Sequence, residues 1–511
     1  MHENLFSALR AAFPADLDGT AVHVIDAVPL VYTWRDLDRA TAMLANLLGS
    51  LGLPPNARIA VQTDKSVEAL MLYLAVLRAG MVYLPLNSAY QASEIEYFIH
   101  NAEPSVVVCS GRNFGWVSKI AFRCGAQNVF TLDDDRRGSL LDRAAQQSDR
   151  HTVAPRAADD PAAILYTSGT TGRSKGAMLS HGNLLSNARA LNDYWGWRAG
   201  DVLIHALPIF HVHGLFVAIH GALLNGSSMR WFNKFDAALA VAQLPQATVF
   251  MGVPTMYVRL LAEPALTREA CRHMRLFVSG SAPLLIDTFN EFRERSGHTI
   301  VERYGMSETL MLTSNPYHAR SGERRGGTVG FALPGVQVRV AASEGGPCAV
   351  DEVGQIEVKG PNVFSGYWRM PEKTREEFTA DGWFRTGDVG SLDAGQCLTI
   401  VGRSKDLIIT GGYNVYPAEV EGYLNEVPGV AESAVIGVPH PDFGEGVVAV
   451  VVARAGAALS ADALIGALKG RIASFKVPKR LFVANDLPRN AMGKVQKNVL
   501  REQHQELFRR T

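Results

Sequence analysis

The sequence predicts an α/β protein in which a large N-terminal domain holds two doubly wound sheets plus a small β-barrel-like part, followed by a small C-terminal α/β domain. The first reason is length, because 511 residues are too many for one compact core. The second is that short apolar runs alternate with longer amphipathic stretches from Thr33 to about Asn233, as parallel strands with crossover helices do. The third is a change of pattern after about Gly326.

The two doubly wound sheets are predicted from apolar runs along the first 280 residues. Arg58–Gln62 is followed by the amphipathic stretch 66–79, and the run 105–110 is followed by another mixed stretch. Residues 247–252 and Leu276–Ser279 continue the theme. Short apolar runs between longer amphipathic stretches are typical of buried parallel strands joined by helices.

The remainder of the chain has a different pattern of apolar and polar residues. Over residues 326–402, short alternating segments such as Gly354–Lys359 lie between Gly and Pro turns, which predicts a small antiparallel sheet or barrel. The last hundred or so residues mix strands, such as 433–438, with helices, such as Pro417–Asn425 and 461–471. A polar run at 402–406 separates two apolar strands. We therefore expect an N-terminal domain over 1–402, a hinge at 403–406 and a C-terminal domain over 407–511.

Composition and charge exclude several classes of protein. Lys and Arg number 50, as do Asp and Glu, so no net charge attracts nucleic acid or a membrane surface. No apolar stretch approaches the roughly 18–20 residues that cross a bilayer, and residues 1–14 do not read as a secretory signal. The five cysteines are widely spaced and odd in number, which indicates thiols in a reducing compartment. A cytoplasmic protein without a nucleic-acid or membrane partner is expected.

A loop rich in Gly, Ser and Thr follows the apolar run 162–166. Its glycines allow the backbone to approach a polyphosphate closely, its hydroxyls donate hydrogen bonds, and Lys175 supplies positive charge. Its spacing is not that of the Walker A loop, and taken alone it is also compatible with a surface turn. Ser180 is expected to cap a following helix. The candidate phosphate-binding residues are Thr167, Ser168, Gly169, Thr170, Thr171, Gly172 and Lys175.

The sequence of this loop, YTSGTTGRSKG at 166–176, strongly resembles the phosphate loop of the adenylate-forming superfamily, which includes acyl-CoA synthetases, adenylation domains and luciferases. Further motifs of that superfamily follow in order along nearly the whole chain. They are LPIFHVHGL at 207–215, SGSAPL at 279–284, YGMSE at 304–308, WFRTGD at 383–388, GRSKD at 402–406, GGYNVYP at 411–417 and PRNAMGK at 488–494. Ser174 is a departure, because most members have Pro there.

The resemblance implies an AMP-forming acid–CoA ligase that uses ATP, Mg²⁺ and coenzyme A. A carboxylate attacks the α-phosphate of ATP and releases pyrophosphate, and the CoA thiol then attacks the acyl-adenylate and releases AMP. Two anions meet in the first step, so charge neutralisation and alignment carry the catalysis. The implied roles are Mg²⁺ binding for Glu308 and Thr170, adenine binding for Tyr304 and Ala282, and ribose binding for Asp388 and Arg403. A core tyrosine at 304 and a structural ion pair at Arg403 are the alternatives.

The C-terminal motifs imply a mobile small domain. Lys494 resembles the family lysine that bridges the carboxylate and the nucleotide during adenylation, a role suited to a long, flexible point charge. Lys405 marks the hinge, about which the small domain is implied to rotate after adenylation. The rotation is implied to replace Lys494 with Gly411 and Gly412, where a narrow pantetheine tunnel leaves no room for Cβ atoms.

The acid is predicted from Arg303, which stands where most relatives have a small or neutral residue. A guanidinium beside the acyl site is costly to desolvate unless a ligand anion pairs with it, which favours a substrate with a second carboxylate. Ser281 is expected to add a hydrogen bond, and His211 to hold the reacting carboxylate or to gate the tunnel. Together with the runs at 203–207 and 359–370, these residues resemble malonyl-CoA synthetases. Pairing of Arg303 with a protein carboxylate such as Glu302 is the alternative.

Malonate is favoured over methylmalonate and succinate, because Phe210 and His211 imply a short pocket, although one methyl group is worth only ~1–3 kcal/mol. Three other functions stay open. They are an adenylation enzyme that loads a carrier protein, an oxygenase of the luciferase type, and a non-catalytic nucleotide-binding relative. Joint retention of Glu308, Asp388 and Lys494 speaks against the last of these.

Overall fold

The structure is a computed structural model that describes residues 3–25, 29–167, 174–318, 322–342, 345–490 and 493–508. Main-chain contacts divide the chain into two units. The N-terminal unit comprises Met1–Gln337 and Val358–Phe384, and the C-terminal unit comprises Val338–Glu357 and Arg385–Thr511. The segment 385–402, expected in the N-terminal domain, thus clusters with the C-terminal residues. The hinge at 403–406 concerns motion and stays a prediction.

The N-terminal unit contains two sheets, each with a parallel centre, as the sequence predicted. In the seven-stranded sheet, β7, β4, β3, β5 and β6 run parallel, while β8 pairs antiparallel with β7 and β18 pairs antiparallel with β8. Its order is β18 (Gly366–Tyr367), β8 (Lys175–Ser180), β7 (Pro161–Thr167), β4 (Val82–Pro85), β3 (Arg58–Gln62), β5 (Val106–Cys109) and β6 (Asn128–Thr131).

The nine-stranded sheet is parallel from β13 to β1 and has antiparallel strands at both ends. Its order is β15 (Phe331–Ala332), β14 (Leu310–Ser314), β13 (Val301–Met306), β12 (Leu276–Ser279), β11 (Val249–Gly252), β9 (Val202–His205), β10 (Ser228–Trp231), β1 (Thr20–Val24) and β2 (Leu30–Thr33). The chain passes from β9 to β10 on one side and then to β11 on the other. The connection therefore reverses beside β9, and ligands commonly bind at the carboxyl ends of the strands at such a point.

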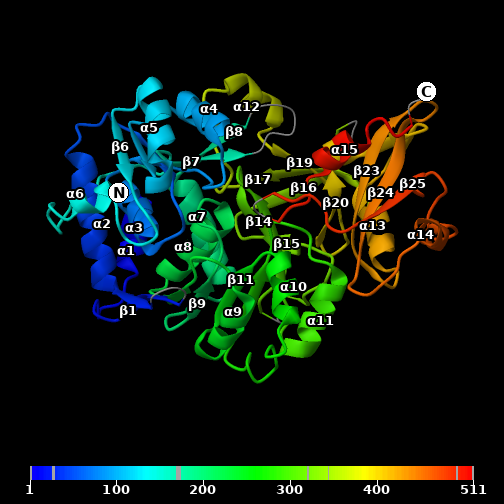
Figure 1. The fold of residues 1–511 in the computed structure, drawn as a ribbon, viewed down its shortest axis with the longest axis horizontal. Helices are drawn as coiled ribbons and strands as arrows, with labels where there is room; N and C mark the ends of the chain where they lie inside the picture. The colour runs from blue at the N-terminus through cyan, green and yellow to red at the C-terminus, as the bar shows by residue number, and fades with distance from the viewer. Residues whose placement is uncertain are drawn as a thin grey trace. The chain divides into compact units, whose positions relative to one another are not determined.

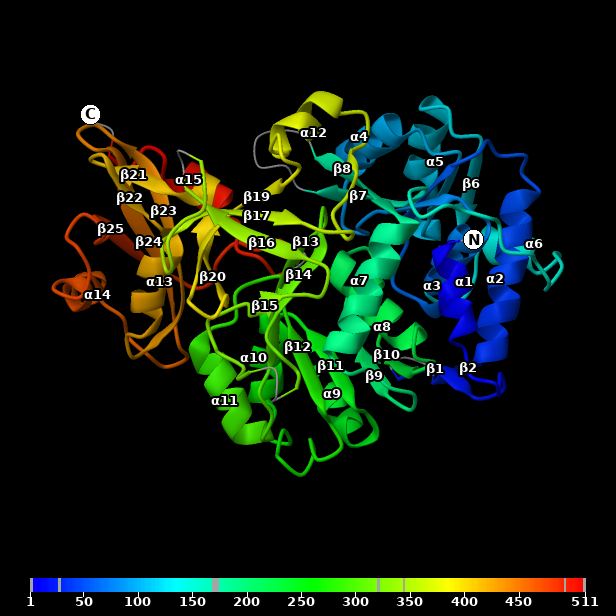
Figure 2. The same ribbon diagram turned by 180° about the vertical axis from the view of Figure 1, so that it is seen from behind.

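Helices α3 (Val67–Arg78) and α8 (Ile219–Leu223) are buried along their whole lengths, as expected for helices that are apolar on all sides. They meet through a hydrogen bond of 2.8 Å between Tyr73 Oη and His220 Nε2. Figures 1 and 2 show α7 and α8 beside α1 and α3. The remaining helices of this unit are α1 (Leu5–Ala11), α2 (Trp34–Gly49), α4 (Ala92–Ala102), α5 (Phe114–Arg123), α6 (Ser139–Ala144), α7 (His181–Tyr194), α9 (Ala237–Gln243), α10 (Pro254–Ala262), α11 (Ile286–Ser296) and α12 (Pro371–Glu377).

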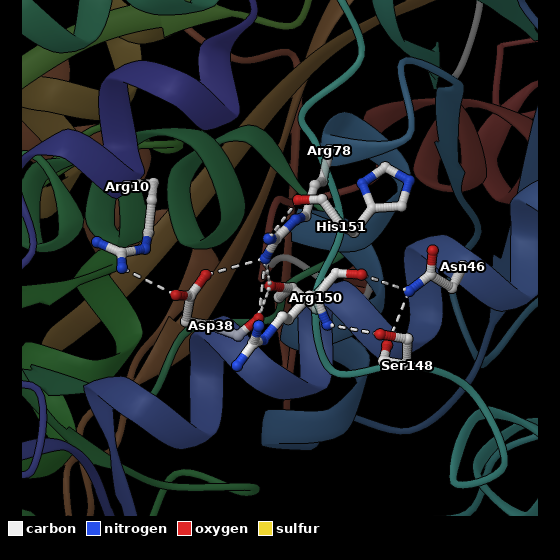
Figure 3. A network of polar contacts seen from close by, with 8 residues as sticks. Arg10, Asp38, Asn46, Arg78, Ser148, Arg150 and His151 are labelled. Carbon is white, nitrogen blue, oxygen red and sulfur yellow. Dashed lines mark hydrogen bonds and ion pairs between the residues drawn. The ribbon is translucent and has the colours of Figure 1, made fainter.

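A polar network on α2 ties the first helices together (Figure 3). Asp38 on α2 accepts hydrogen bonds from Arg10 of α1 at 2.8 Å and from Arg78 of α3 at 2.9 Å. Arg78 also donates to the carbonyl of His151 at 2.8 Å, and Asn46 donates to the carbonyl of Arg150 at 2.9 Å. The segment that leads to β7 is thereby fastened to α2 and α3.

The C-terminal unit contains most of a four-stranded sheet, where a small sheet or barrel was expected, and a second, five-stranded sheet. The first has the order β16 (Gln337–Ala341), β17 (Gly354–Lys359), β19 (Phe384–Leu392) and β20 (Leu398–Arg403). In the second, β22 (Tyr413–Val415), β21 (Ile408–Thr410), β24 (Gly444–Ala453) and β23 (Val430–His440) are neighbours in that order, and β25 (Arg480–Ala484) pairs with β24. Its helices are α13 (Pro417–Asn425), α14 (Ala461–Leu468) and α15 (Lys497–His504).

One predicted helix is shorter than expected. The sequence pattern extended it over 461–471, but α14 ends at Leu468. Gly470 has a φ of +83°, in the left-handed region that favours glycine and ends helices.

Among the described residues, no helix has the length and apolar character needed to cross a membrane.

Candidate active site

The predicted acid-binding residues lie where parallel strands of the nine-stranded sheet end. Residues 280–282 follow β12, Arg303 and Tyr304 are the third and fourth of the six residues of β13, and His211 and His213 follow β9. Because β9, β12 and β13 run parallel, these residues gather at one edge of the sheet. The topology therefore brings three motifs that are far apart in the sequence to one place.

The guanidinium of Arg303 lies against the turn that follows β12. The side chain is 3% exposed, and a Cβ added at Gly280 would lie 2.4 Å from its Cζ. Only glycine at 280 leaves room for this approach. Within the described part of the chain, Arg303 Nε and Nη2 have no hydrogen-bond partner. Burial lowers the pKa of Arg303 to about 9, so the group still carries its charge near neutral pH.

Ser281 has a φ of +73°, although a serine seldom adopts the left-handed region. Its hydroxyl lies 3.4 Å from Nδ1 of His213, the first residue of the π-helical segment η2 (His213–Ala218). Burial holds the pKa of His213 well below its usual range, and the nearby charge of Arg303 lowers it further. His213 is therefore neutral and serves as a hydrogen-bonding group beside Ser281.

Glu302 does not neutralise Arg303. Its carboxyl accepts a hydrogen bond of 3.0 Å from the backbone N–H of Leu284, and neighbouring residues of a strand point to opposite faces. Burial raises the pKa of Glu302 to about 8, so the group is mostly protonated at pH 7. Glu302 instead fastens the turn that contains Ser281 to β13.

The predicted adenine contacts flank the same turn. Tyr304 is 9% exposed on β13, and Ala282 is half-buried. A Cβ at Gly305 would lie 2.0 Å from the carbonyl oxygen of Leu310, so the backbone beside Tyr304 needs glycine. His211 is half-buried, and its charge would lower the pKa of His213, which places the two histidines close together.

The phosphate loop lies largely outside the described residues, because its predicted members Ser168, Gly169, Thr170, Thr171 and Gly172 belong to the undescribed range. Its two ends are described, and they show that the loop joins the antiparallel strands β7 and β8. Thr167 Oγ1 donates to the carbonyl of Lys175 at 3.4 Å. The helix that Ser180 was expected to cap is α7, which begins after β8, and Ser180 Oγ accepts from the N–H of Asn183 at 3.1 Å. The loop therefore connects two antiparallel strands, and the next helix begins only after β8.

Glu308, Tyr367 and Lys175 come together beside this loop. The Tyr367 hydroxyl donates to Oε1 of the buried Glu308 at 3.0 Å, and Lys175 Nζ lies 4.2 Å from the centre of the Tyr367 ring. Lys175 also pairs with Glu377 at 3.2 Å. A carboxylate oxygen held in this way suits Mg²⁺, which takes one or two protein carboxylates and completes its shell with phosphate and water. The donor chemistry at Glu308 thus fits the predicted metal.

The predicted ribose-binding residues pair with one another in the C-terminal unit. Arg403 Nε lies 3.0 Å from Oδ1 of the buried Asp388, and the two residues are partners across β19 and β20. Ser404, at the start of the expected hinge, donates to the carbonyl of Gly387 at 2.9 Å. Next to Lys405, Asp406 pairs with Arg501 at 2.6 Å. Ribose binding and the hinge role of Lys405 stay predictions.

Gly411 and Gly412 form the two-residue turn between β21 and β22. Their φ values of +59° and +81° suit the primed turns of tight hairpins, which require glycine or a few other residues. The turn alone thus accounts for both glycines. Tyr413, directly after them, is 59% exposed and stacks on Phe475 at 4.7 Å.

Lys494 is exposed on a short turn before α15. Its backbone N–H donates to Oδ1 of Asn490 at 3.0 Å, and its carbonyl accepts from the N–H of Asn490 at 2.9 Å.

Sequence reasoning missed two residues of this region. No role is predicted for His213 from the sequence, although the residue stands two positions from His211 and directly before Gly214. Tyr367 lies in the run 359–370, whose resemblance to malonyl-CoA synthetases predicts no role for this tyrosine. The contact between Tyr367 and Glu308 spans 59 positions, so no local pattern could reveal it.

Family models and curated relatives match most of the chain. The AMP-binding enzyme family matches residues 16–368, and the AMP-binding enzyme C-terminal domain matches residues 419–494. A malonate–CoA ligase of Arabidopsis thaliana is 35% identical over 87% of this chain and 78% of that protein, and a mitochondrial malonate–CoA ligase of Mus musculus is 34% identical over 92% and 87%.

Solved structures are similar over the whole chain. ATP-bound MatB from Rhodopseudomonas palustris is 52% identical, covers 100% of both chains and has a TM-score of 0.96. A benzoate CoA ligase from Burkholderia xenovorans is 27% identical over 98% of this chain and 99% of that one, with a TM-score of 0.87. Similar folds therefore occur in ligases named for different acids, and the chain belongs to the AMP-binding enzyme family.

Proposed function

We propose that the chain is an ATP-dependent malonyl-CoA synthetase. One carboxylate oxygen of malonate attacks the α-phosphorus of ATP, the bond to the β-phosphate oxygen breaks, and pyrophosphate leaves. The CoA thiol then loses its proton and attacks the acyl carbon of malonyl-adenylate, and AMP leaves with the electrons of the broken C–O bond. The products are malonyl-CoA, AMP and pyrophosphate.

The observation that carries the choice of acid is the buried guanidinium of Arg303. Two of its nitrogens have no hydrogen-bond partner among the described residues, and Glu302 is turned away from it. Leaving such a charge without an anion costs several kcal/mol. A ligand carboxylate supplies that anion and can accept two parallel hydrogen bonds from the guanidinium. Relatives named malonate–CoA ligases are consistent with this choice.

Ser281 and His213 complete the recognition of the distal carboxylate. The Ser281 hydroxyl can donate to the carboxylate while it accepts a hydrogen bond from His213, in the neutral tautomer that carries its proton on Nδ1. The neighbouring His211 is assigned to the reacting carboxylate. Arg303 lies on β13 and Ser281 lies in the turn after the neighbouring strand β12, and both are assigned to the second carboxylate of malonate.

The nucleotide is assigned to the family motifs. Lys175 and the loop that precedes it hold the phosphates, Tyr304 and Ala282 hold adenine, and Asp388 with Arg403 holds the ribose. Mg²⁺, held by Glu308 and Thr170 when bound, would neutralise charge between phosphate oxygens. Tyr367 orients the Glu308 carboxylate through its hydrogen bond.

Two parts of the C-terminal unit are assigned to different half-reactions. Lys494 serves adenylation, in which its ammonium stabilises the negative charge shared by the incoming carboxylate and the α-phosphate. Gly411 and Gly412 serve thioester formation, in which the pantetheine arm of CoA passes close to the backbone. A rotation at 403–406, centred on Lys405, exchanges the two.

A panel of mono- and dicarboxylic acids of two to five carbons tests the proposal, with ATP and CoA present and AMP release as the readout. Malonate should give the highest kcat/KM, followed by methylmalonate, while acetate and propionate should react poorly. In Arg303→Met, which keeps bulk and removes charge, kcat/KM for malonate should fall by about 2–5 kcal/mol of transition-state stabilisation, and propionate should lose little. Equal losses for malonate and propionate, or unchanged malonate turnover, would refute the role of Arg303.

A further inference from the structure

We propose that Arg489 is the positioning residue for the adenylation lysine: its guanidinium joins the Glu432 carboxylate on β23 to the carbonyl oxygen of Gly493 and so fixes the turn that carries Lys494. The inference rests on the proposed function, because it assumes that Lys494 acts in adenylation. All the contacts involved lie within the C-terminal unit.

The peptide group between Gly493 and Lys494 is held on both sides. Its carbonyl oxygen accepts a hydrogen bond of 2.8 Å from Nη1 of Arg489, and its N–H donates to Oδ1 of Asn490 at 3.0 Å. A peptide group held at both its donor and its acceptor cannot rotate about the neighbouring bonds without losing a hydrogen bond. The direction in which the Lys494 side chain leaves the backbone is therefore set by Arg489 and Asn490 together.

The turn itself is tight. The N–H of Gly493 donates to the carbonyl of Asn490 at 2.9 Å, and Gly493 has a φ of +75°, where glycine is favoured. Arg489 and Val495 form an isolated antiparallel bridge across the base of the turn. Arg489 thus belongs to the base of the same turn whose tip its side chain reaches.

Arg489 also connects the turn to the five-stranded sheet. Its Nη2 donates to Oε2 of Glu432, one of the residues of β23 that pair with β24. The Arg489 and Glu432 side chains are 26% and 29% exposed, so the pair is partly shielded from water. One planar guanidinium reaches both acceptors because its donors point in fixed, divergent directions, which a lysine cannot reproduce. Through Arg489, the five-stranded sheet therefore holds the carbonyl group next to Lys494.

A second anchor follows the turn but does not contact it. Lys497, the first residue of α15, pairs with Glu421 of α13 at 2.6 Å, and the N–H of Gln496 donates to the carbonyl of Pro488 at 2.7 Å. These bonds hold the start of α15, so the fold of this region does not depend on Arg489 alone. Removing the Arg489 side chain should loosen the turn while α15 stays in place.

The test separates the two half-reactions in the full-length protein. Adenylation is followed by malonate-dependent exchange of pyrophosphate into ATP, and thioester formation is followed with supplied malonyl-adenylate and CoA. Arg489→Gln should lower the kcat of adenylation by about 10²-fold, as misplacement of a catalytic group by about 1 Å does, with KM for malonate and ATP unchanged. Thioester formation should be unaffected. Arg489→Lys should recover only part of the loss, and Glu432→Gln should show the same pattern more weakly.

Two reference variants make the outcomes distinguishable. Lys494→Ala should abolish adenylation and spare thioester formation, and if it keeps adenylation, the proposed role of the lysine fails and the inference falls with it. Arg471→Gln removes an exposed arginine that pairs with Glu426 in the same unit and should change neither half-reaction. If Arg489→Gln lowers both half-reactions together with the melting temperature, or lowers neither, Arg489 does not position Lys494.

Discussion

Arg275 and Arg303 lie at opposite ends of the parallel strands of one sheet, the first largely buried and the second buried, and they differ in what surrounds them. Arg275 directly precedes β12, at the amino ends of the parallel strands, and donates from Nε to Asp201 at 2.7 Å and from Nη1 to the carbonyl of Trp195 at 3.1 Å. Arg303 lies in the middle of β13, one residue beyond the level at which the neighbouring strand β12 ends, and the described residues leave two of its nitrogens without a partner. One charge is satisfied by the protein, and the other is left for a ligand.

The pKa values of the two arginines differ in the same way as their hydrogen-bond partners do. Burial acts to lower the pKa of Arg275, but its hydrogen bonds with Asp201 raise the value overall. Burial also lowers the pKa of Arg303, and there the attractions of Tyr257 and Glu302 are too weak to reverse it. A buried cation that the protein itself does not compensate is a cost that binding of an anion removes. Burial alone therefore does not mark a functional arginine, whereas burial with unsatisfied donors does.

The largest expected effect is on stability, from exchange of the satisfied arginine. Arg275→Gln should reduce the free energy of unfolding by about 3–5 kcal/mol, because it removes the closest cationic partner of the buried Asp201, whose charge the hydrogen bonds from Thr248 and the backbone of Arg198 do not neutralise. KM for malonate should not change. Arg303→Met should instead lose malonate turnover and keep or increase its free energy of unfolding. Urea unfolding of both variants, with malonate kinetics beside it, checks the contrast.

The comparison fails if Arg303→Met destabilises the protein as much as Arg275→Gln does. Arg303 would then be a structural arginine whose partners lie among residues that the structure does not describe. A matched exchange at the exposed pair of Arg35 and Asp18 should have little effect on either property, since exposed ion pairs contribute only about 0–1 kcal/mol.

Local patterns were sufficient for much of the fold. The run Arg58–Gln62 is β3, the helix predicted over Pro417–Asn425 is α13, and the stretch 66–79 contains α3 with Ser66 as its cap. Each of these depends on periodicity and capping within one element. The two sheets with parallel centres were also correctly predicted, because strand–helix alternation limits the topologies available.

Contacts between distant segments could not be read from the sequence in this way. Nothing near Arg303 shows that its guanidinium lies on Gly280, or that Glu302 turns away to hold Leu284. The pairing of Tyr367 with Glu308 and the assignment of 338–357 to the C-terminal unit are likewise products of packing. Gly411 and Gly412 were explained by a tunnel, although the hairpin turn already requires them. A motif identifies residues by resemblance, whereas their partners are a property of the fold.

A smaller effect concerns the dependence of stability on pH through Glu302. Its pKa is about 8 in the folded protein and near 4.5 when unfolded, so the folded state binds the proton more tightly. The stabilisation is present in acid and is lost as pH rises towards 8, at about 1.4 kcal/mol for each pH unit. Between pH 6 and 7.5 the native protein should therefore lose stability relative to Glu302→Gln, which cannot titrate. If the free energies of unfolding of the native protein and Glu302→Gln differ by the same amount at both pH values, Glu302 is charged in the folded protein and able to pair with Arg303.

The smallest expected effect is at Ser281, where the cost to stability comes from a strained backbone and not from a buried charge. Its φ of +73° costs a serine roughly 1–2 kcal/mol relative to glycine. Ser281→Gly should therefore raise the melting temperature, yet increase KM for malonate by about 2–10-fold, since a hydrogen bond to the carboxylate contributes about 0.5–1.5 kcal/mol. Ser281→Ala is the matched control, because it keeps the strained backbone and loses the hydroxyl. It should show the same rise in KM without the gain in stability. If the alanine variant binds malonate as the native protein does, the strain at Ser281 serves only to place Gly280 beneath Arg303, and recognition of the second carboxylate rests on the guanidinium alone.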